Sequence, residues 1–155
     1  MARRPRCAVC HEPHYRYTRE ATLRDLKRLA NKIRRSDIHQ KGQIKNIYGV
    51  PHGGLAPAWY LSNALGLPLI FCKEEIGPRT LVVDDIAETG KTIIPLRPAL
   101  IAVLWYHRER CILEPEEVRF WVRLKTNKTG WVEFCAWETR KTTHLSVHKE
   151  QHPST

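Results

Sequence analysis

Two adjacent carboxylates stand directly before a short run of hydroxyl-bearing residues and glycine. In the segment LVVDDIAETGKT, Asp84 and Asp85 follow an apolar run and precede the residues from Thr89 to Thr92. A carboxylate pair accepts hydrogen bonds from a vicinal diol or holds Mg²⁺ through water. Hydroxyls and backbone N–H groups at a helix start suit a terminal phosphate, although the P-loop spacing G-x-x-x-x-G-K-[ST] is absent. The segment therefore predicts a site for a phosphorylated sugar with a free diol.

A second loop, with two glycines at its centre, lies upstream in the segment GVPHGGL. Gly53 and Gly54 let the backbone approach a ligand without Cβ atoms in the way. The helix pattern that follows offers free N–H groups to an anion. A plain turn is the alternative interpretation of this glycine pair. The loop is thus a second candidate anion site.

The elements that must position these loops alternate between strand and helix patterns. Strand patterns cover residues 15–17, 44–50, 67–72, 80–83, 99–106, 117–124 and 131–137. Helix patterns cover residues 19–36, 55–66 and, briefly, 91–96. Thr18 is placed to cap the first helix and Gly66 to end the second. The first helix is expected to bury four apolar side chains, namely Leu23, Leu26, Ala30 and Ile33.

This alternation predicts the fold class. Strands that are joined through helices run parallel, with right-handed crossovers, so we expect an α/β protein with a doubly wound parallel sheet. Such sheets bind ligands beyond the carboxyl ends of their strands, which is where both loops fall. No repeat or linker divides the chain. We expect one domain over residues 15–138, a basic extension at 1–14 and a polar tail at 139–155.

The composition favours a globular protein with an anionic ligand. The chain has 155 residues, of which 42% are hydrophobic, and a formal net charge of +10. A positive surplus attracts nucleic acid, nucleotides, phosphorylated sugars or anionic lipid, and a solvated helix face is the other interpretation of any single basic cluster. No apolar run approaches the ~20 residues that span a bilayer, and the basic N-terminus lacks the apolar core of a secretory signal. We therefore expect a cytoplasmic protein without a membrane partner.

Three segments of the chain together resemble one enzyme family. LVVDDIAETGKT is similar to the signature loop of type I phosphoribosyltransferases, in which two acids precede a Thr-Gly phosphate turn. GVPHGGL resembles the pyrophosphate loop of the same family. GWVEFCAWE, at residues 130–138, resembles the closing segment of the xanthine-guanine-hypoxanthine branch. The resemblance spans residues 15–138 and implies a minimal version of the type I phosphoribosyltransferase fold.

The resemblance also implies an activity and a set of site residues. The expected enzyme is a glycosyltransferase of purine salvage, which transfers the ribose 5-phosphate of phosphoribosyl pyrophosphate to a purine-type base and releases pyrophosphate. It uses Mg²⁺ and works as a homodimer or higher homo-oligomer. Asp84 and Asp85 hold the ribose hydroxyls and Mg²⁺, and Glu88 takes a proton from the incoming base. The other implied contacts are His52, Gly53 and Gly54 for pyrophosphate, Glu88, Thr89, Gly90, Lys91 and Thr92 for the 5′-phosphate, and Trp131 and Val132 for the base.

The chain departs from the family pattern at several places. Only residues 73–79 separate the strand patterns where the family carries a long mobile lid, and the helix pattern after the phosphate turn is cut to residues 91–98. His52 stands where Arg or Lys is common. Residues 106–108, Tyr-His-Arg, stand where 6-oxopurine enzymes place a Lys. The alternative function is therefore a catalytically weak, nucleotide-sensing or RNA-binding regulator on the same fold.

The N-terminal extension contains a pattern typical of half a zinc site. Cys7 and Cys10 form a C-x-x-C pair with His14 nearby, and a C-terminal histidine or a second chain would complete the Zn²⁺ ligands. An incidental cysteine pair is the other interpretation, and a zinc-stabilised interaction module is a further alternative function. The five cysteines are odd in number and scattered, which does not indicate a disulfide framework.

Overall fold

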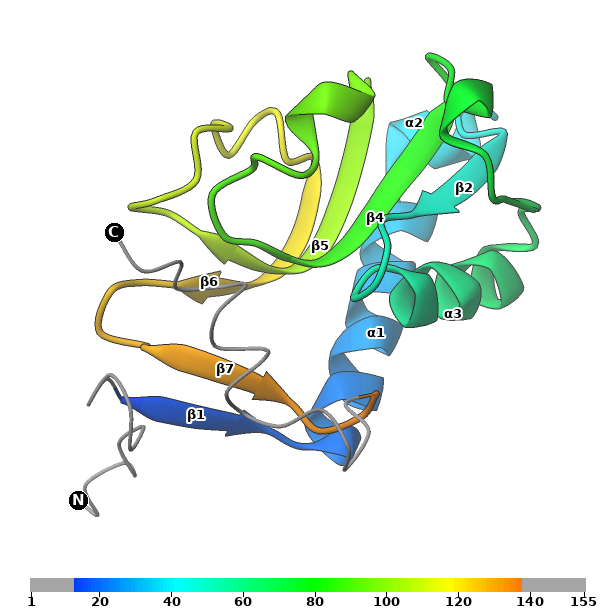
Figure 1. Ribbon diagram of the computed structural model, residues 1–155. Helices are drawn as coiled ribbons and strands as arrows, with labels where there is room; N and C mark the ends of the chain where they lie inside the picture. The colour runs from blue at the N-terminus through cyan, green and yellow to red at the C-terminus, as the bar shows by residue number, and fades with distance from the viewer. Residues whose placement is uncertain (1–12, 138–155) are drawn as a thin grey trace.

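Five parallel strands form the main sheet of the protein (Figure 1). The computed structural model describes residues 13–137. The strand order is β3-β2-β4-β5-β6, and each neighbouring pair is parallel. The bounds are Asn46–Gly49 for β2, Leu69–Ile70 for β3, Thr80–Ala87 for β4, Leu100–His107 for β5 and Phe120–Lys125 for β6. The predicted α/β fold class with a parallel sheet is confirmed.

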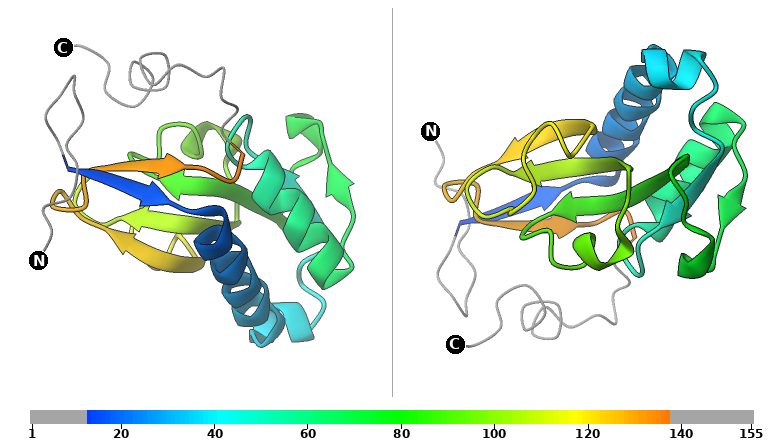
Figure 2. Two further views of the ribbon diagram at one scale, coloured as in Figure 1. Left: turned by 90° about the horizontal axis from the view of Figure 1, so that it is seen from below. Right: turned by 90° about the horizontal axis from the view of Figure 1, so that it is seen from above.

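Two short strands from opposite ends of the described chain form a second sheet. β1 (His14–Tyr17) pairs in parallel with β7 (Trp131–Phe134). Backbone hydrogen bonds extend this pairing at both ends, from the Trp131 N–H to the Pro13 carbonyl at 2.8 Å and from the Cys135 N–H to the Tyr17 carbonyl at 3.1 Å. The views of Figures 1 and 2 place this sheet beside the main sheet as a separate layer.

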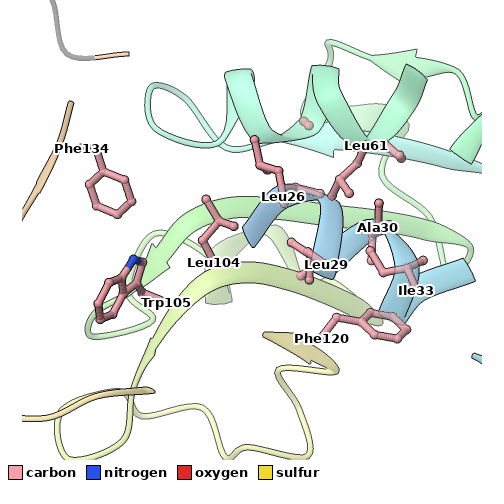
Figure 3. Close-up of a cluster of buried hydrophobic side chains, with 14 of the residues drawn as sticks. Leu26, Leu29, Ala30, Ile33, Leu61, Leu104, Trp105, Phe120 and Phe134 are labelled. Atoms are coloured by element: carbon pink, nitrogen blue, oxygen red, sulfur yellow. The ribbon is translucent and has the colours of Figure 1, made fainter. Parts of the chain in front are cut away.

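Two α-helices pack on one face of the main sheet. They are α1 (Arg19–Arg34) and α3 (Leu55–Leu65), and a short helix, α2 (Asp37–Gln40), follows α1. Figure 3 shows the core that they close, with α1 and α3 side chains meeting those of β5 and β6. Thr18 caps α1 by accepting a hydrogen bond from the Ala21 N–H at 3.2 Å, and Gly66 ends α3 with φ at 66°. Both predicted helix boundaries are therefore confirmed.

The buried face of α1 differs in part from the predicted one. Leu26, Ala30 and Ile33 are buried, but Leu23 is 49% exposed. Leu29 is fully buried instead. The buried stripe is centred on positions 22, 26, 29 and 33, so residue 23 lies at its flank.

The opposite face of the main sheet is covered by connections between strands. The 3₁₀ helix η2 (Ile94–Leu96) replaces the brief helix predicted over residues 91–96. Ile93, Leu113 and Val118 pack there against β4 and β5. Among residues 13–137, no α-helix covers this face, which agrees with the shortened helix pattern after the phosphate turn. None of the described helices is long and apolar enough to cross a membrane.

The predicted strand over residues 67–72 is wrong in its length. Only Leu69 and Ile70 pair with β2, at the edge of the sheet. Phe71, the next residue, is 76% exposed. The pairing ends at Tyr48 and Ile70, although β2 continues to Gly49, so the apolar pattern extends beyond the ladder.

Candidate functional site

The two loops that the sequence singles out lie against each other. The Val50 N–H, after β2, donates to the Val83 carbonyl in β4 at 2.9 Å. Gly54 lies so close to this carbonyl that a Cβ atom would overlap it, and a Cβ atom on Gly53 would overlap the Asp85 carboxylate. The backbone of β4 therefore leaves no room for a side chain at Gly54, and the Asp85 carboxylate occupies that space at Gly53.

The upstream loop leads directly into a helix. His52 is exposed, and its peptide bond with Pro51 is cis. The Gly54 N–H donates to the Val50 carbonyl at 2.8 Å and closes the turn. α3 begins at Leu55, so the amino end of an 11-residue helix lies at this loop, as the sequence predicts.

The sequence pattern had placed the acid pair after a strand, but in the structure the pair lies inside one. β4 continues to Ala87, and Asp84 is paired with Val103 of β5. β5 supplies backbone partners for Asp84, Ile86 and Ala87, so the ladder continues past the acid pair in the same register. Asp84 is 7% exposed, and its Oδ1 accepts the Asp85 N–H at 2.9 Å.

Burial controls the protonation of both acids. It raises the pKa of Asp84 well above the usual range, and the charge of Asp85 raises it further. Burial also raises the pKa of Asp85, while hydrogen bonds from Asp84, the Ile86 N–H and the Trp137 side chain lower it. Two adjacent, poorly hydrated carboxylates are costly to ionise together, so this site favours a cation or hydroxyl donors that share the charge.

The phosphate turn follows the strand at once. Gly90 is buried and takes a left-handed conformation with φ at 82°, which glycine adopts without a penalty. The Lys91 N–H lies 3.4 Å from the Thr89 hydroxyl oxygen. Lys91 and Thr92 are exposed. The turn therefore presents a cationic side chain and a hydroxyl to solvent at the carboxyl end of β4.

A segment that the sequence did not identify forms the wall of this turn. The Ile112 N–H donates to the Thr89 carbonyl at 3.0 Å. A Cβ atom on Gly90 would lie 3.3 Å from Leu113 and 3.4 Å from the Cys111 sulfur. Residues 111–113 thus fix the position of the turn, although their types carry no signal of this role.

A polar cavity of about 130 Å³ opens beside Glu88, where β4, β5 and β6 end. The buried Lys125 Nζ lies 2.8 Å from Glu88 Oε2, and Arg110 Nη1 lies 3.2 Å from Oε1. The buried His107 Nε2 lies 3.8 Å from Oε1. Burial lowers the pKa of His107, and its Nδ1 accepts the Arg110 backbone N–H at 3.2 Å. Sequence reasoning missed Lys125, because it stands in one of several basic clusters and only the fold brings it to Glu88.

The closing segment does not present the exposed Trp131 ring that was expected to stack on the base. Trp131 is 2% exposed and Val132 is 1% exposed, so the Trp131 ring presents no open face in this structure. Trp137 stacks on Phe134 with 5.4 Å between ring centroids, and its side chain hydrogen-bonds Asp85. The aromatic ring in contact with the acid pair is therefore that of Trp137.

The connection between β3 and β4 is short, as predicted. It covers residues 71–79 and contains one 3₁₀ turn, η1 (Lys73–Glu75). The residues from Phe71 to Glu75 are exposed. This connection is the only chain between the two strands, so the protein itself carries no long lid at this position.

The described residues hold no ready-made metal cluster. No group of three or more His, Cys, Asp or Glu side chains within residues 13–137 could hold a metal ion. Of the zinc ligands expected from the sequence, Cys7 and Cys10 lie outside the described residues. His14 lies in β1, with Nε2 3.3 Å from Glu133 Oε2. Zinc therefore finds no support in the described part of the chain.

The sequence is similar to orotate phosphoribosyltransferases over a little less than half of its length. An orotate phosphoribosyltransferase of Bartonella bacilliformis is 34% identical over 87 residues, which cover 48% of this chain and 44% of that protein. One of Brucella ovis is 34% identical over 79 residues, which cover 43% and 40% of the two chains. The matched region thus spans less than half the length of these curated relatives. No family profile matches the chain.

Solved structures of phosphoribosyltransferases share the fold over most of the chain. A purine phosphoribosyltransferase from Pyrococcus horikoshii covers 81% of this chain and 94% of its own, with a TM-score of 0.58 and 24% identity. The Helicobacter pylori xanthine-guanine-hypoxanthine phosphoribosyltransferase covers 88% and 99%, with a TM-score of 0.59 and 16% identity. A hypothetical protein from Neisseria gonorrhoeae with bound ppGpp covers 90% and 96%, with a TM-score of 0.63 and 17% identity. The chain has the type I phosphoribosyltransferase fold.

Proposed function

We propose that this chain is a phosphoribosyltransferase, which transfers the ribose 5-phosphate of phosphoribosyl pyrophosphate to a nitrogenous base and releases pyrophosphate. The sequence favours a purine-type base, whereas the curated relatives are named for orotate. The contact of the glycine loop with the acid pair carries the proposal. Because Gly53 contacts Asp85, the loop proposed for the leaving pyrophosphate lies beside a carboxylate proposed for the ribose diol.

The chemistry assigns one task to each part of the site. Displacement of pyrophosphate builds positive charge on the anomeric carbon, as in glycoside transfer. Asp84 and Asp85 would hold the ribose hydroxyls and stabilise that charge. Residues 89–92 would bind the 5′-phosphate, and residues 52–54 the pyrophosphate. Glu88 would accept a proton from the base.

Mg²⁺ fits this donor set. Mg²⁺ prefers oxygen ligands and keeps several waters, so one or two carboxylates with substrate oxygens suffice. Asp84 and Asp85 provide such carboxylates, and their mutual repulsion falls when a cation shares their charge. When bound, Mg²⁺ would stabilise the leaving pyrophosphate. A homodimer is a further part of the proposal, by analogy with the fold.

The test is binding of phosphoribosyl pyrophosphate by isothermal titration calorimetry, with and without Mg²⁺. We expect Mg²⁺-dependent binding, and release of pyrophosphate when an accepted base is added. The variant Asp84→Asn with Asp85→Asn should lose at least tenfold in affinity. The matched control neutralises two exposed acids outside the site, Glu20→Gln with Asp37→Asn, and should bind like wild type. Equal binding by the wild type and the Asp84 and Asp85 double variant would refute the site.

A nucleotide-sensing regulator is the second candidate. Two observations favour it, namely the short β3–β4 connection and the similar structure that holds ppGpp. Such a regulator would bind a phosphorylated nucleotide at the same loops without releasing pyrophosphate. An RNA-binding regulator would in addition bind RNA with a steep dependence on salt. Pyrophosphate release with any base, abolished in the Asp84 and Asp85 double variant, distinguishes the enzyme from both.

A further inference from the structure

The cavity beside Glu88 carries more permanent positive than negative charge. Its lining comprises Glu88, His107, Arg110, Lys125, Thr126, Asn127 and Gly130. Both cations pair with the single carboxylate of Glu88, Lys125 at 2.8 Å and Arg110 at 3.2 Å. Glu109 accepts the Asn127 N–H at 2.9 Å, but its side chain is exposed and does not line the cavity. One carboxylate therefore faces two cations, of which Lys125 is only 3% exposed.

His107 adds a donor and not an acceptor. Its Nδ1 accepts the Arg110 backbone N–H, so a neutral ring carries its proton on Nε2, toward Glu88. Burial lowers the pKa of His107, which favours that neutral ring. Apart from Glu88, the charged and ring side chains of the cavity thus offer N–H groups. A ligand edge with acceptors or a negative charge complements them, and an amino edge does not.

The position of the cavity along the chain points to the same ligand group. Glu88 stands between Asp85, proposed for the ribose hydroxyls, and Thr89, which begins the proposed phosphate site. A ribose 5-phosphate held at both ends would have its anomeric carbon and base near Glu88. Gly130, directly before β7, forms another part of the cavity wall.

We infer that this cavity receives the base, and that Lys125 and Arg110 select a base with a negative charge. The inference rests on the proposed function and adds the class of the base. A ring carboxylate and an ionised ring oxo group share the required chemistry. Without a ligand, Glu88 alone pairs with both cations. The anionic group of the base would pair with one of them, so that each cation has an anionic partner of its own.

Nucleoside 5′-monophosphates isolate the base, because all of them share ribose 5-phosphate. Calorimetry would compare orotidine, xanthosine, inosine and adenosine monophosphates, together with ribose 5-phosphate. We expect the orotidine or the xanthosine compound, which carry anionic bases, to bind at least tenfold more tightly than the adenosine compound. Orotidine tests a carboxylate on a pyrimidine, xanthosine tests a ring anion on a purine, and inosine tests a neutral oxo group.

The variant Lys125→Met should reduce this preference to less than threefold. The matched control is Lys128→Met, which removes the same charge from an exposed position three residues away and should keep the preference. If Lys125→Met does not fold, Arg110→Met gives the second measurement, since that side chain is 40% exposed. It should lower the preference at least threefold.

Two outcomes would overturn the inference. One is equal binding of the adenosine and the two anionic monophosphates by the wild type. The other is a full preference in the folded Lys125→Met or Arg110→Met protein. Either result leaves the proposed function intact if ribose 5-phosphate still binds and if the variant Asp84→Asn with Asp85→Asn still weakens that binding. Failure of every monophosphate and of ribose 5-phosphate to bind would instead refute the proposed function.

Discussion

The Cα atom of Gly53 faces the carboxylate of Asp85 so closely that no side chain fits between them. This contact joins the glycine loop to strand β4, more than thirty residues further along the sequence. Gly54 makes the equivalent contact with the backbone of β4, at the Val83 carbonyl. The relative position of the glycine loop and the acid pair is therefore set by backbone packing.

Gly53→Ala should damage the site. The added methyl group must displace either the loop or the Asp85 carboxylate, because the Cβ atom would overlap that group. We expect at least a tenfold loss in affinity for phosphoribosyl pyrophosphate with Mg²⁺, measured by calorimetry. Gly77→Ala is the matched control, since a Cβ atom there meets nothing within 4 Å. Wild-type affinity in Gly53→Ala would contradict the proposed geometry.

Asp84→Asn should stabilise the fold at neutral pH and not in acid. The pKa of Asp84 is raised in the folded protein, so this group contributes its full stability only below the usual aspartate pKa near 4. That contribution is lost as the pH rises through the raised pKa, and asparagine removes the cost of ionisation. We expect a gain of about 1 kcal/mol or more in the free energy of unfolding at pH 7.5.

Urea denaturation at pH 7.5 and at pH 3.5 measures this effect. At pH 3.5 Asp84 is protonated in the folded state, and the gain should largely vanish. Asp37→Asn, at an exposed position, serves as the control and should show no such gain. A gain of the same size at both pH values would show that ionisation of Asp84 is not its cause.

The chemistry of the two loops could be predicted from local sequence, because both depend on residue types within a few positions. Thr18 and Gly66 likewise marked helix ends through local hydrogen bonding and a left-handed turn. The continuation of β4 through Asp84 and Asp85 could not be predicted, because the carboxylates have low strand propensity and only the pairing with β5 holds them there.

The polar partners of Glu88 also could not be predicted from the sequence. Lys125 lies 37 positions from Glu88, and one lysine among 26 basic residues carries no local mark. Ile112 closes the phosphate turn through its backbone N–H, which every residue except proline possesses. The burial of Trp131 depends on the β1–β7 pairing, so its ring could not be distinguished from an exposed one in advance.

Asp25→Ala should strongly destabilise the protein. Asp25 is fully buried in α1, accepts the Tyr17 hydroxyl of β1 at 2.7 Å and pairs with Arg123 of β6. Arg123 also contacts the faces of Tyr17 and Trp105, each at 5.5 Å from the ring centroid. Loss of the carboxylate leaves a partly buried guanidinium without its partner, which costs about 3–5 kcal/mol.

This cluster connects the β1–β7 sheet to the main sheet, so a graded series can measure the connection. Tyr17→Phe removes only the hydroxyl and should cost about 1–2 kcal/mol in the free energy of unfolding. Asp37→Ala, an exposed acid of α2, should cost less than either. Urea denaturation measures all three. A loss below about 1 kcal/mol in Asp25→Ala would show that the cluster does not hold the sheets together.

Trp137→Phe should strengthen binding of phosphoribosyl pyrophosphate. The Trp137 side chain hydrogen-bonds Asp85 and takes one of the acceptor positions that a ribose hydroxyl would otherwise use. Phenylalanine keeps an aromatic ring to stack on Phe134 but lacks the donor. One hydrogen bond of ordinary strength corresponds to a gain of about threefold or more in affinity. Trp59→Phe, on an exposed residue of α3, should leave affinity unchanged. A smaller ligand-induced change in tryptophan fluorescence would accompany either result. A lower affinity in Trp137→Phe would mean that Trp137 binds the ligand and does not compete with it.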